Sequence, residues 1–328
     1  MQILVSFLNA LPGAAAQGII WGIMAIGVYL TFRLLDFPDL TVDGSFATGG
    51  AVMAMCAING VNLWLCVLLA FVAGCLAGLM TGIFHTKFGI PAILAGILSQ
   101  LALYSINLRI LGNKANQGLN ARNYDLIVYL GEPERAIWVS ALFALVLIAI
   151  LYWFFGTELG SGIRATGTNP AMSRANGINT SRNTIIGLVL SNGLVALSGA
   201  LMTQYQGFAD VNMGRGAIVI GLAAVIIGEV LLGKLFKNFA LRLLACVIGG
   251  VLYYVVITLV LRFGLNANDL KLLTALVVAV FLGAPYWKEK MTIRRLGIAN
   301  AKRAAAARAA EAEASTPTHV SAPVGGVA

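Results

Sequence analysis

The chain is built from apolar stretches long enough to cross a lipid bilayer, separated by short polar breaks. Hydrophobic residues make up 59% of its 328 residues and charged residues only 11%, whereas a soluble domain carries roughly 25% charged residues. A bilayer-spanning helix needs about 20 mostly apolar residues, and stretches of this kind recur along most of the chain. The sequence therefore predicts an all-α, polytopic membrane protein.

We expect about nine transmembrane helices, with eight to ten as the range. They lie near residues 12–34, 44–60, 63–84, 90–111, 137–156, 183–206, 216–233, 239–262 and 269–287. Residues 1–290 would form one transmembrane domain, which includes a polar loop at residues 157–182. Residues 291–328 are basic and rich in alanine, and they predict a cytoplasmic tail that is partly disordered.

Positively charged residues collect on one side of this topology. Arg164, Arg174 and Arg182 lie between the fifth and sixth spans, and further Lys and Arg residues follow the seventh and ninth spans. Because short loops rich in Lys and Arg stay in the cytoplasm, this side is predicted to be cytoplasmic, with the N-terminus outside. The formal net charge of +9 then indicates attraction to membrane lipid and not nucleic-acid binding.

The sequence offers little for catalysis or metal binding. It has two histidines and four cysteines, with no HExxH or GxSxG motif and no cysteine spacing typical of a metal site. The stretch GEVLLGKL, residues 228–235, begins like a phosphate-binding loop, but Leu235 occupies the position where Ser or Thr would reach Mg²⁺, and no strand precedes it. We therefore expect no metal, no cofactor and no enzymatic activity.

Two glycine repeats predict close helix packing. Gly74, Gly78 and Gly82 recur every fourth residue in the third span, and Gly18 and Gly22 have the same spacing in the first. Small residues at this spacing let helices approach closely in lipid. The pattern leaves open whether these helices contact a second subunit or other helices of the same bundle.

Two short apolar segments are rich in glycine and follow charged residues. Asp39 and Asp43 lead into the segment at residues 44–60, and Asp210 and Arg215 lead into the segment near residues 216–233. The predicted topology gives the two segments opposite directions, and paired Gly-interrupted segments in two inverted halves point to a transport pathway. The alternative is a plain polar entry from a loop into a helix.

Further polar residues lie at membrane depth, where side chains face the bundle interior or a cavity. Such residues either line a pathway or form hydrogen bonds between helices. The predicted pathway residues are Asp39, Asp43, Ser45, Ser99, Gln100, Asn107, Asn192, Gln204 and Asp210. Glu229, near the cytoplasmic end of the seventh span, is close enough in sequence to pair with Lys234.

The stretch NPAMSRANG, residues 169–177, predicts a helix of about two turns inside the polar loop. Asn169 is a typical N-cap, Pro170 suits the first helical position, and Gly177 suits the stop. The helix is too short to cross a membrane and too polar to be buried in one, so we expect it on the cytoplasmic surface. Met172 and Arg174 suit contact with another protein, and an ordered spacer between two spans is the alternative.

Residues 158–201 resemble the permease subunits of bacterial ABC importers in the branched-chain amino acid and ribose group. The matching positions are Arg164, Ala165, Gly167, Asn169, Gly177 and Ile178. The resemblance extends over residues 18–285, and the stretch LTVDGSFATGGA is most similar to a branch associated with amino acids such as tryptophan or tyrosine. It implies an ATPase-coupling helix whose contact residues are Arg164, Gly167, Asn169, Pro170, Met172, Arg174 and Gly177.

The same resemblance implies a set of partners. The permease would form a homodimer in the bacterial inner membrane, with a cytoplasmic ABC ATPase that binds ATP and an extracytoplasmic substrate-binding lipoprotein. This chain would form the substrate pathway and couple it to the ATPase. A secondary transporter with inverted repeats and no ATPase is the alternative. Ion coupling would then require acidic residues within the membrane, whereas most acidic residues here lie at the ends of spans.

Overall fold

The computed structural model describes residues 2–119, 124, 126–233, 236, 238–262 and isolated residues between 272 and 293. Residues 1–281 form one unit and residues 282–328 another. The elements of the first unit are α1 (Gln2–Tyr29), the π-helical turn η1 (Leu30–Leu34), α2 (Val42–Ile58), α3 (Leu63–Thr86), α4 (Ala92–Ile110), β1 (Asn116–Gly118), α5 (Pro133–Phe155), α6 (Glu158–Thr168), α7 (Pro170–Ala175), α8 (Thr180–Gln206), β2 (Phe208–Asp210), α9 (Ala217–Leu232) and α10 (Phe239–Arg262).

Six of the described helices are long and apolar enough to cross a membrane, and two shorter apolar helices, α2 and α9, accompany them. These eight helices coincide with the first eight predicted spans, so the prediction of a helical, polytopic membrane protein is confirmed. The first span is longer than expected, because α1 begins at Gln2 and continues through Pro12. The predicted ninth span at residues 269–287 falls largely outside the described residues, and so does the tail at residues 291–328.

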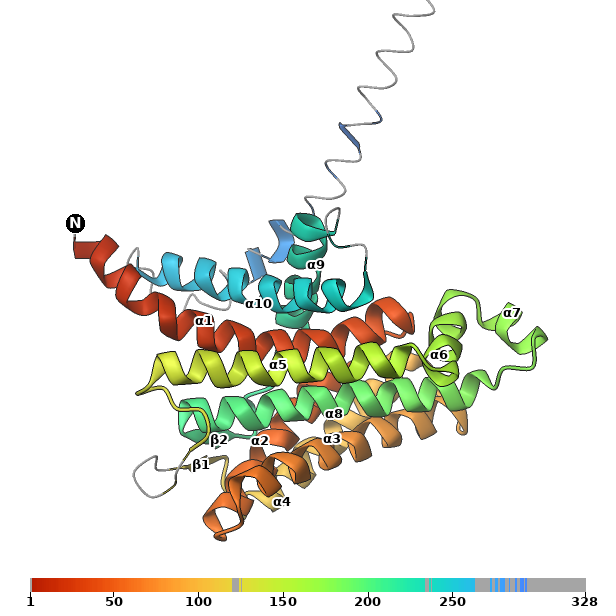
Figure 1. Cartoon of the computed structure of the whole chain (residues 1–328). Coiled ribbons are helices and arrows are strands. Elements are labelled where there is room, and N and C mark those ends of the chain that lie inside the picture. Colours follow the sequence, from red (N-terminus) through yellow and green to blue (C-terminus); the bar gives the residue numbers. More distant parts are fainter. Residues whose placement is uncertain are drawn as a thin grey trace, which may run out of the picture. The chain divides into compact units, whose positions relative to one another are not determined.

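The long helix α8 lies at the centre of the bundle and packs against α1, α2 and α3. Helices α6 and α7 stand at one end of the bundle, and strands β1 and β2 lie at the other (Figure 1). We call these the α7 end and the β end. The two strands pair in antiparallel fashion with Asn116 opposite Asp210, a short pairing that the sequence does not predict.

Both glycine repeats pack helices of this chain against one another. A Cβ atom at Gly78 in α3 would collide with the backbone carbonyl of Leu188 in α8, and a Cβ at Gly22 in α1 would lie 2.8 Å from the Cα of Val247 in α10. Glycine is therefore needed at these positions for the backbones to approach. Of the two roles left open by the sequence, packing within the bundle is the one these glycines have.

The short helices α2 and α9 begin beside each other. The carboxylate of Asp43, at the start of α2, accepts hydrogen bonds from the backbone N–H groups of Gly216 and Ile218, both at 2.9 Å. The chain ahead of each helix, residues 35–41 and 211–216, is not helical. Asp43 thus caps α9 and joins the starting points of the two helices.

From this shared point the two helices run to opposite ends of the bundle. Met53 in α2 accepts a hydrogen bond at Sδ from Gln204 at 3.6 Å, near the end of α8. Glu229 in α9 pairs with Arg33 in η1. Because α8 ends at the β end and η1 lies at the α7 end (Figure 1), α2 points to the β end and α9 to the α7 end.

Candidate functional site

Three of the predicted pathway residues meet in one buried hydrogen-bond network. Asn192 on α8 donates from Nδ2 to Oδ2 of Asp39 at 2.7 Å, and it accepts at Oδ1 from Oγ of Ser45 at 2.6 Å. The other carboxylate oxygen of Asp39 accepts from the backbone N–H of Thr41 at 2.9 Å. All three pathway side chains are at most 3% exposed, and each has partners, as buried polar groups require. The network fixes the non-helical segment before α2 onto α8.

A row of hydroxyl groups extends this polar region toward α4. Oγ1 of Thr81 in α3 lies 2.7 Å from Oγ1 of Thr41 and donates to Oγ of Ser99 in α4 at 2.7 Å. Ser99 is fully buried. The described contact of this predicted pathway residue is therefore a hydrogen bond between helices.

A pocket of about 400 Å³ lies between α4 and the starts of α2 and α9. It is lined by Asp43, Gly44, Ile97, Gln100, Leu101, Tyr104, Asn107, Val211 and Arg215. Three predicted pathway residues, Asp43, Gln100 and Asn107, are thus brought together in one cavity. We call this cavity the midpoint pocket, because it lies where α2 and α9 begin.

The midpoint pocket combines unpaired polar groups with an apolar wall. Asn107 is 1% exposed; its Nδ2 donates to the Gly44 carbonyl at 3.4 Å, whereas its Oδ1 has no partner among the described residues. The exposed Arg215 makes no ion pair with any described residue. A few polar groups converging beside apolar side chains, here Ile97 and Leu101, are typical of a small-molecule site.

The last two predicted pathway residues lie outside this pocket and hold loops near the β end. Oε1 of Gln204 accepts from the backbone N–H of Ile127 at 3.0 Å and so anchors the segment before α5. Oδ1 of Asp210 accepts from the backbone N–H of Asn212 at 2.7 Å and shapes the turn after β2. These two contacts are those of loop anchors, and Gln204 also donates to Met53 in α2.

Helix α7 has the geometry that its sequence predicts. Asn169 caps it by accepting from the backbone N–H of Met172 at 3.0 Å, Pro170 is its first residue, and Gly177 follows it with a φ of +77°. This left-handed conformation costs glycine little. Met172 is 63% exposed and Arg174 is exposed. The predicted cap, start and stop are confirmed, and the helix presents an apolar and a cationic side chain to its surroundings.

Helix α6 precedes α7 and is not anticipated by the sequence reading, which treats residues 157–169 as loop. Thr157 acts as its N-cap by accepting at Oγ1 from the backbone N–H of Gly160 at 3.4 Å. Thr157 followed by an acidic residue, Glu158, is a recognisable signal for a helix start. The polar loop between the fifth and sixth spans is therefore two helices in succession.

Two predicted coupling residues lie in α6 and face their own chain. Arg164 donates to the backbone carbonyl of Phe155, and its guanidinium lies 5.5 Å from the ring centroid of Phe239 in α10. A Cβ at Gly167 would collide with the backbone carbonyl of Leu34. These residues hold α6 against the bundle, whereas Met172 and Arg174 lie free of it.

Glu229 pairs with an arginine of η1. Nε of Arg33 donates to Glu229 at 3.0 Å, so Glu229 has a partner other than the Lys234 that the sequence suggested; Lys234 itself lies outside the described residues. Within the described part of the chain, no group of three His, Cys, Asp or Glu residues could hold a metal ion.

Comparison with known proteins identifies the family. Residues 11–283 match the branched-chain amino acid transport system permease component family. The chain is 40% identical over 275 residues to a tyrosine transport system permease protein of Clostridioides difficile (strain R20291), covering 84% of this chain and 91% of that protein. It is 32% identical over 281 residues to an uncharacterized protein of Rickettsia prowazekii (strain Madrid E), covering 84% and 98%. It is 30% identical over 227 residues to the ribose import permease protein of Escherichia coli (strain K12), covering 67% and 69%. The chain therefore belongs to the branched-chain amino acid transport system permease component family, and it is a multi-pass membrane protein.

Proposed function

We propose that the chain is the membrane permease of an ATP-driven importer, with α7 as the docking helix for a separate ABC ATPase. The observation that carries this proposal is the exposure of Met172 and Arg174 on a short, capped helix beyond the end of the bundle. A helix that presents an apolar anchor and a cation fits a groove on a partner protein. Such a partner would cover the Met172 side chain, which is 63% exposed.

Contacts around α6 support a mechanical role for this docking helix. α7 follows α6 after the single residue Asn169. α6 is joined to α8 by a hydrogen bond of 3.1 Å from Nδ2 of Asn183 to Oγ1 of Thr166, and to η1 by the close contact of Gly167 with Leu34. A displacement of α7 by the ATPase would therefore move α6, η1 and the adjoining part of α8 together.

The substrate pathway is proposed to pass the midpoint pocket. Non-helical backbone at membrane depth is tolerated where it is buried or lines a cavity, and transporters built from inverted repeats place their substrate sites where broken helices begin. The opposite directions of α2 and α9 from Asp43 support two inverted repeats. We accordingly propose nine spans, with the α7 end in the cytoplasm, the N-terminus outside, and a substrate-binding lipoprotein at the outer face.

A second copy of the permease is proposed to cover the midpoint pocket. The pocket opens beside α4, whose exposed side chains include Ile97, Leu101 and Tyr104. Arg215 at this opening would be costly to expose to lipid hydrocarbon. A homodimer formed through α4 would instead place two such pockets along a shared, protein-lined pathway.

An amino acid is the proposed substrate class. Arg215 offers a guanidinium that suits a carboxylate, and Ile97, Leu101 and Tyr104 offer an apolar and aromatic wall for a side chain. The similar protein of Clostridioides difficile is a tyrosine transport permease, which supports this choice, whereas the Escherichia coli relative is a ribose permease. A sugar has no carboxylate to pair with Arg215.

Co-purification with the cognate ATPase tests the proposal. We expect Met172→Glu and Arg174→Ala each to reduce the amount of ATPase retained and to lower ATP-dependent uptake. The control Arg135→Ala lies at the end of α5 that is distant from α7, and it should keep both ATPase binding and uptake. If both α7 variants bind the ATPase and transport normally, α7 is not the docking helix. Uptake that persists in cells lacking the ATPase and stops when the ion gradient collapses would favour the secondary transporter.

A further inference from the structure

A second, basic cavity of about 740 Å³ lies at the α7 end of the bundle, between α1, α5, α6 and α10. It is lined by Tyr29, Leu34, Tyr152, Trp153, Phe155, Gly156, Thr157, Arg164, Asn238, Phe239 and Arg242. Among the described residues, this lining contains two arginines and no acidic residue. We call it the basic cavity, and it is separate from the midpoint pocket.

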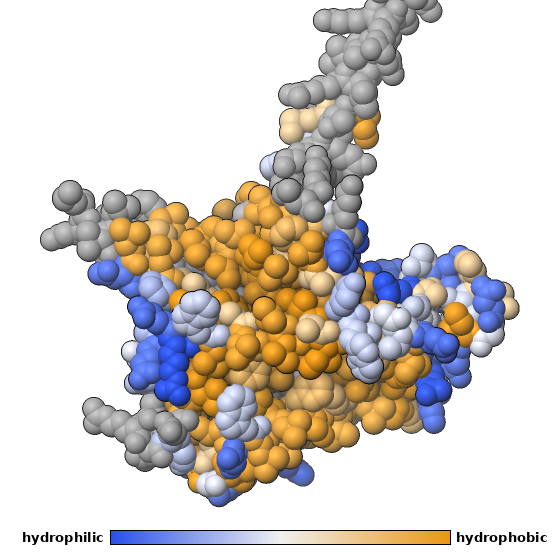
Figure 2. Space-filling view, viewed as in Figure 1, coloured by the Kyte–Doolittle hydropathy of each residue, from blue (hydrophilic) through white to orange (hydrophobic). Residues whose placement is uncertain are grey.

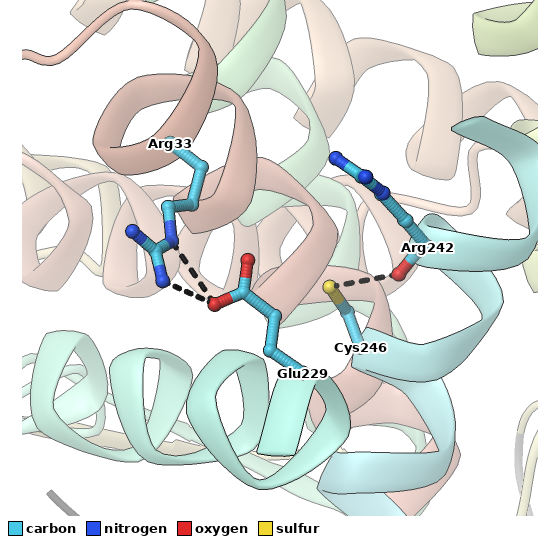
Figure 3. Close-up of polar contacts among 4 residues, drawn as sticks. All are labelled: Arg33, Glu229, Arg242 and Cys246. Carbon is cyan, nitrogen blue, oxygen red and sulfur yellow. Dashed lines mark hydrogen bonds and ion pairs between the residues drawn. The ribbon is translucent and has the colours of Figure 1, made fainter. Parts of the chain in front are cut away.

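The two arginines of the basic cavity lack an acidic partner. Neither Arg164 nor Arg242 forms an ion pair with a described residue. The carboxylate drawn in Figure 3, that of Glu229, is paired with Arg33, and no dashed line joins it to Arg242. The hydroxyl of Tyr29, which also lines the cavity, is a neutral group. Two positive charges are thus left for an anion from outside the described part of the chain.

An apolar groove of about 460 Å³ begins next to this cavity and runs along α5 and α10. It is lined by Ile19, Ala141, Ala144, Leu145, Ile148, Ala240, Leu241, Leu244, Val247, Ile248 and Val251. On α5 the groove residues Ala141, Ala144 and Ile148 form a stripe that the next turn continues to Tyr152 of the basic cavity. The small side chains of Ala141, Ala144 and Ala240 leave room between the helices.

The position of aromatic residues places the basic cavity at the level of lipid headgroups. Trp153 is 73% exposed and Tyr152 is 50% exposed, and such amphipathic rings gather at the membrane–water interface. Figure 2 shows the hydrophobic surface over α5 and α10 giving way to paler and hydrophilic residues toward the α7 end. The groove therefore lies at hydrocarbon depth and the cavity at its polar edge.

We propose that the chain binds one anionic phospholipid between α5 and α10, with the headgroup phosphate at Arg164 and Arg242 and an acyl chain in the apolar groove. Basic pockets between transmembrane helices suit anionic headgroups, and burial of an acyl chain in an apolar groove adds to the affinity. A free phosphate would use the cavity alone, and a neutral lipid would use the groove alone. A phospholipid with a net negative charge uses both.

Native mass spectrometry of the purified full-length chain tests this site with three probes. They are phosphatidylglycerol, phosphatidylcholine with the same acyl chains, and inorganic phosphate. We expect phosphatidylglycerol to bind at least about tenfold more tightly than phosphatidylcholine, because two cations face the headgroup. Arg242→Gln should weaken phosphatidylglycerol binding about fivefold, whereas Arg242→Lys, which keeps the charge, should weaken it less. Arg182→Gln, an equal charge change at the same end of the bundle, should leave it unchanged.

A groove variant separates headgroup from acyl-chain binding. Ala240→Trp should fill the groove and weaken binding of both lipids, whereas Ala149→Trp, on an exposed part of α5 outside the groove lining, should weaken neither. The proposal is wrong if the two lipids bind equally, if Arg242→Gln binds as the native chain does, or if inorganic phosphate alone competes fully with phosphatidylglycerol. If size-exclusion chromatography shows that Arg242→Gln is not folded, the comparison of Ala240→Trp with Ala149→Trp tests the proposed site instead.

Discussion

Oδ1 of Asp43 in α2 accepts a hydrogen bond from the backbone N–H of Ile218 in α9 at 2.9 Å. The same carboxylate satisfies a second N–H group of the α9 start, so one side chain provides the cap of a helix far away in sequence. The first turn of α9 would otherwise leave these donors unpaired in the interior. The two short helices are therefore joined at the point from which they diverge.

Replacing Asp43 with alanine should destabilise the protein by about 1–2 kcal/mol, because it removes the N-cap of α9. Asp43→Asn keeps one acceptor oxygen and should therefore reduce the free energy of unfolding by less than Asp43→Ala. Thermal unfolding in detergent measures both effects, with Glu134→Ala, an exposed acidic residue in the first turn of α5, as the control. Equal unfolding temperatures for Asp43→Ala and the native chain would contradict the capping role.

Replacing Asn192 with leucine should destabilise the protein by about 3 kcal/mol, because it removes the partner of the buried Oδ2 of Asp39 and of the Ser45 hydroxyl. The exchange Asp39→Asn with Asn192→Asp restores a donor facing an acceptor, so the double variant should be more stable than Asn192→Asp alone. Denaturant titration of the three variants checks this. A double variant no better than the single one would mean that the network does not couple these positions.

Gly78→Ala should destabilise the bundle by about 1–3 kcal/mol, because the added methyl group would collide with the carbonyl of Leu188 and force α3 and α8 apart. Gly118→Ala is the matched control, since a Cβ there meets no atom within 4 Å. The unfolding temperatures of the two variants give the comparison. An unchanged unfolding temperature for Gly78→Ala would show that the contact between α3 and α8 can relax to accommodate the methyl group.

Arg215→Gln should lower the rate of uptake of the proposed amino-acid substrate about tenfold or more, because a charge-assisted hydrogen bond to the substrate carboxylate would be lost. Arg215→Lys should retain part of the rate. Arg109→Gln, an exposed arginine of α4 that does not line the midpoint pocket, is the control. Transport by cells that carry the complete importer is the measurement, and binding of the substrate to the proposed substrate-binding protein should stay unchanged. Normal uptake by the Arg215→Gln variant would show that Arg215 does not bind the substrate.

Features set by neighbouring residues could be predicted from the sequence. The start and stop of α7 depend on Asn169, Pro170 and Gly177, whose capping chemistry acts within a few residues. The long spans follow from hydrophobic length alone. The π-helical turn η1 has no comparable local signal, and the pairing of Asn116 with Asp210 joins two short segments that are distant in sequence.

The grouping of polar residues could not be predicted in the same way. The sequence places Ser45, Gln100 and Gln204 in one set because all are polar at membrane depth. The structure divides them, since Ser45 is bonded to Asn192, Gln100 lines the midpoint pocket, and Gln204 anchors a loop. Helix packing decides which neighbour forms a hydrogen bond with a polar side chain. Local sequence patterns do not reveal that packing.

The backbones of α6 and η1 pack closely at Gly167 and Leu34, with no room for a side chain between them. Five residues after Leu34 the chain reaches Asp39, which is bonded to α8 beside the start of α2. A displacement of α6 would thus be transmitted through the short segment from Leu34 to Asp39 to the start of α2. In the proposed coupling mechanism, inserting one flexible residue between Leu34 and Asp39 should let α6 move without moving the start of α2.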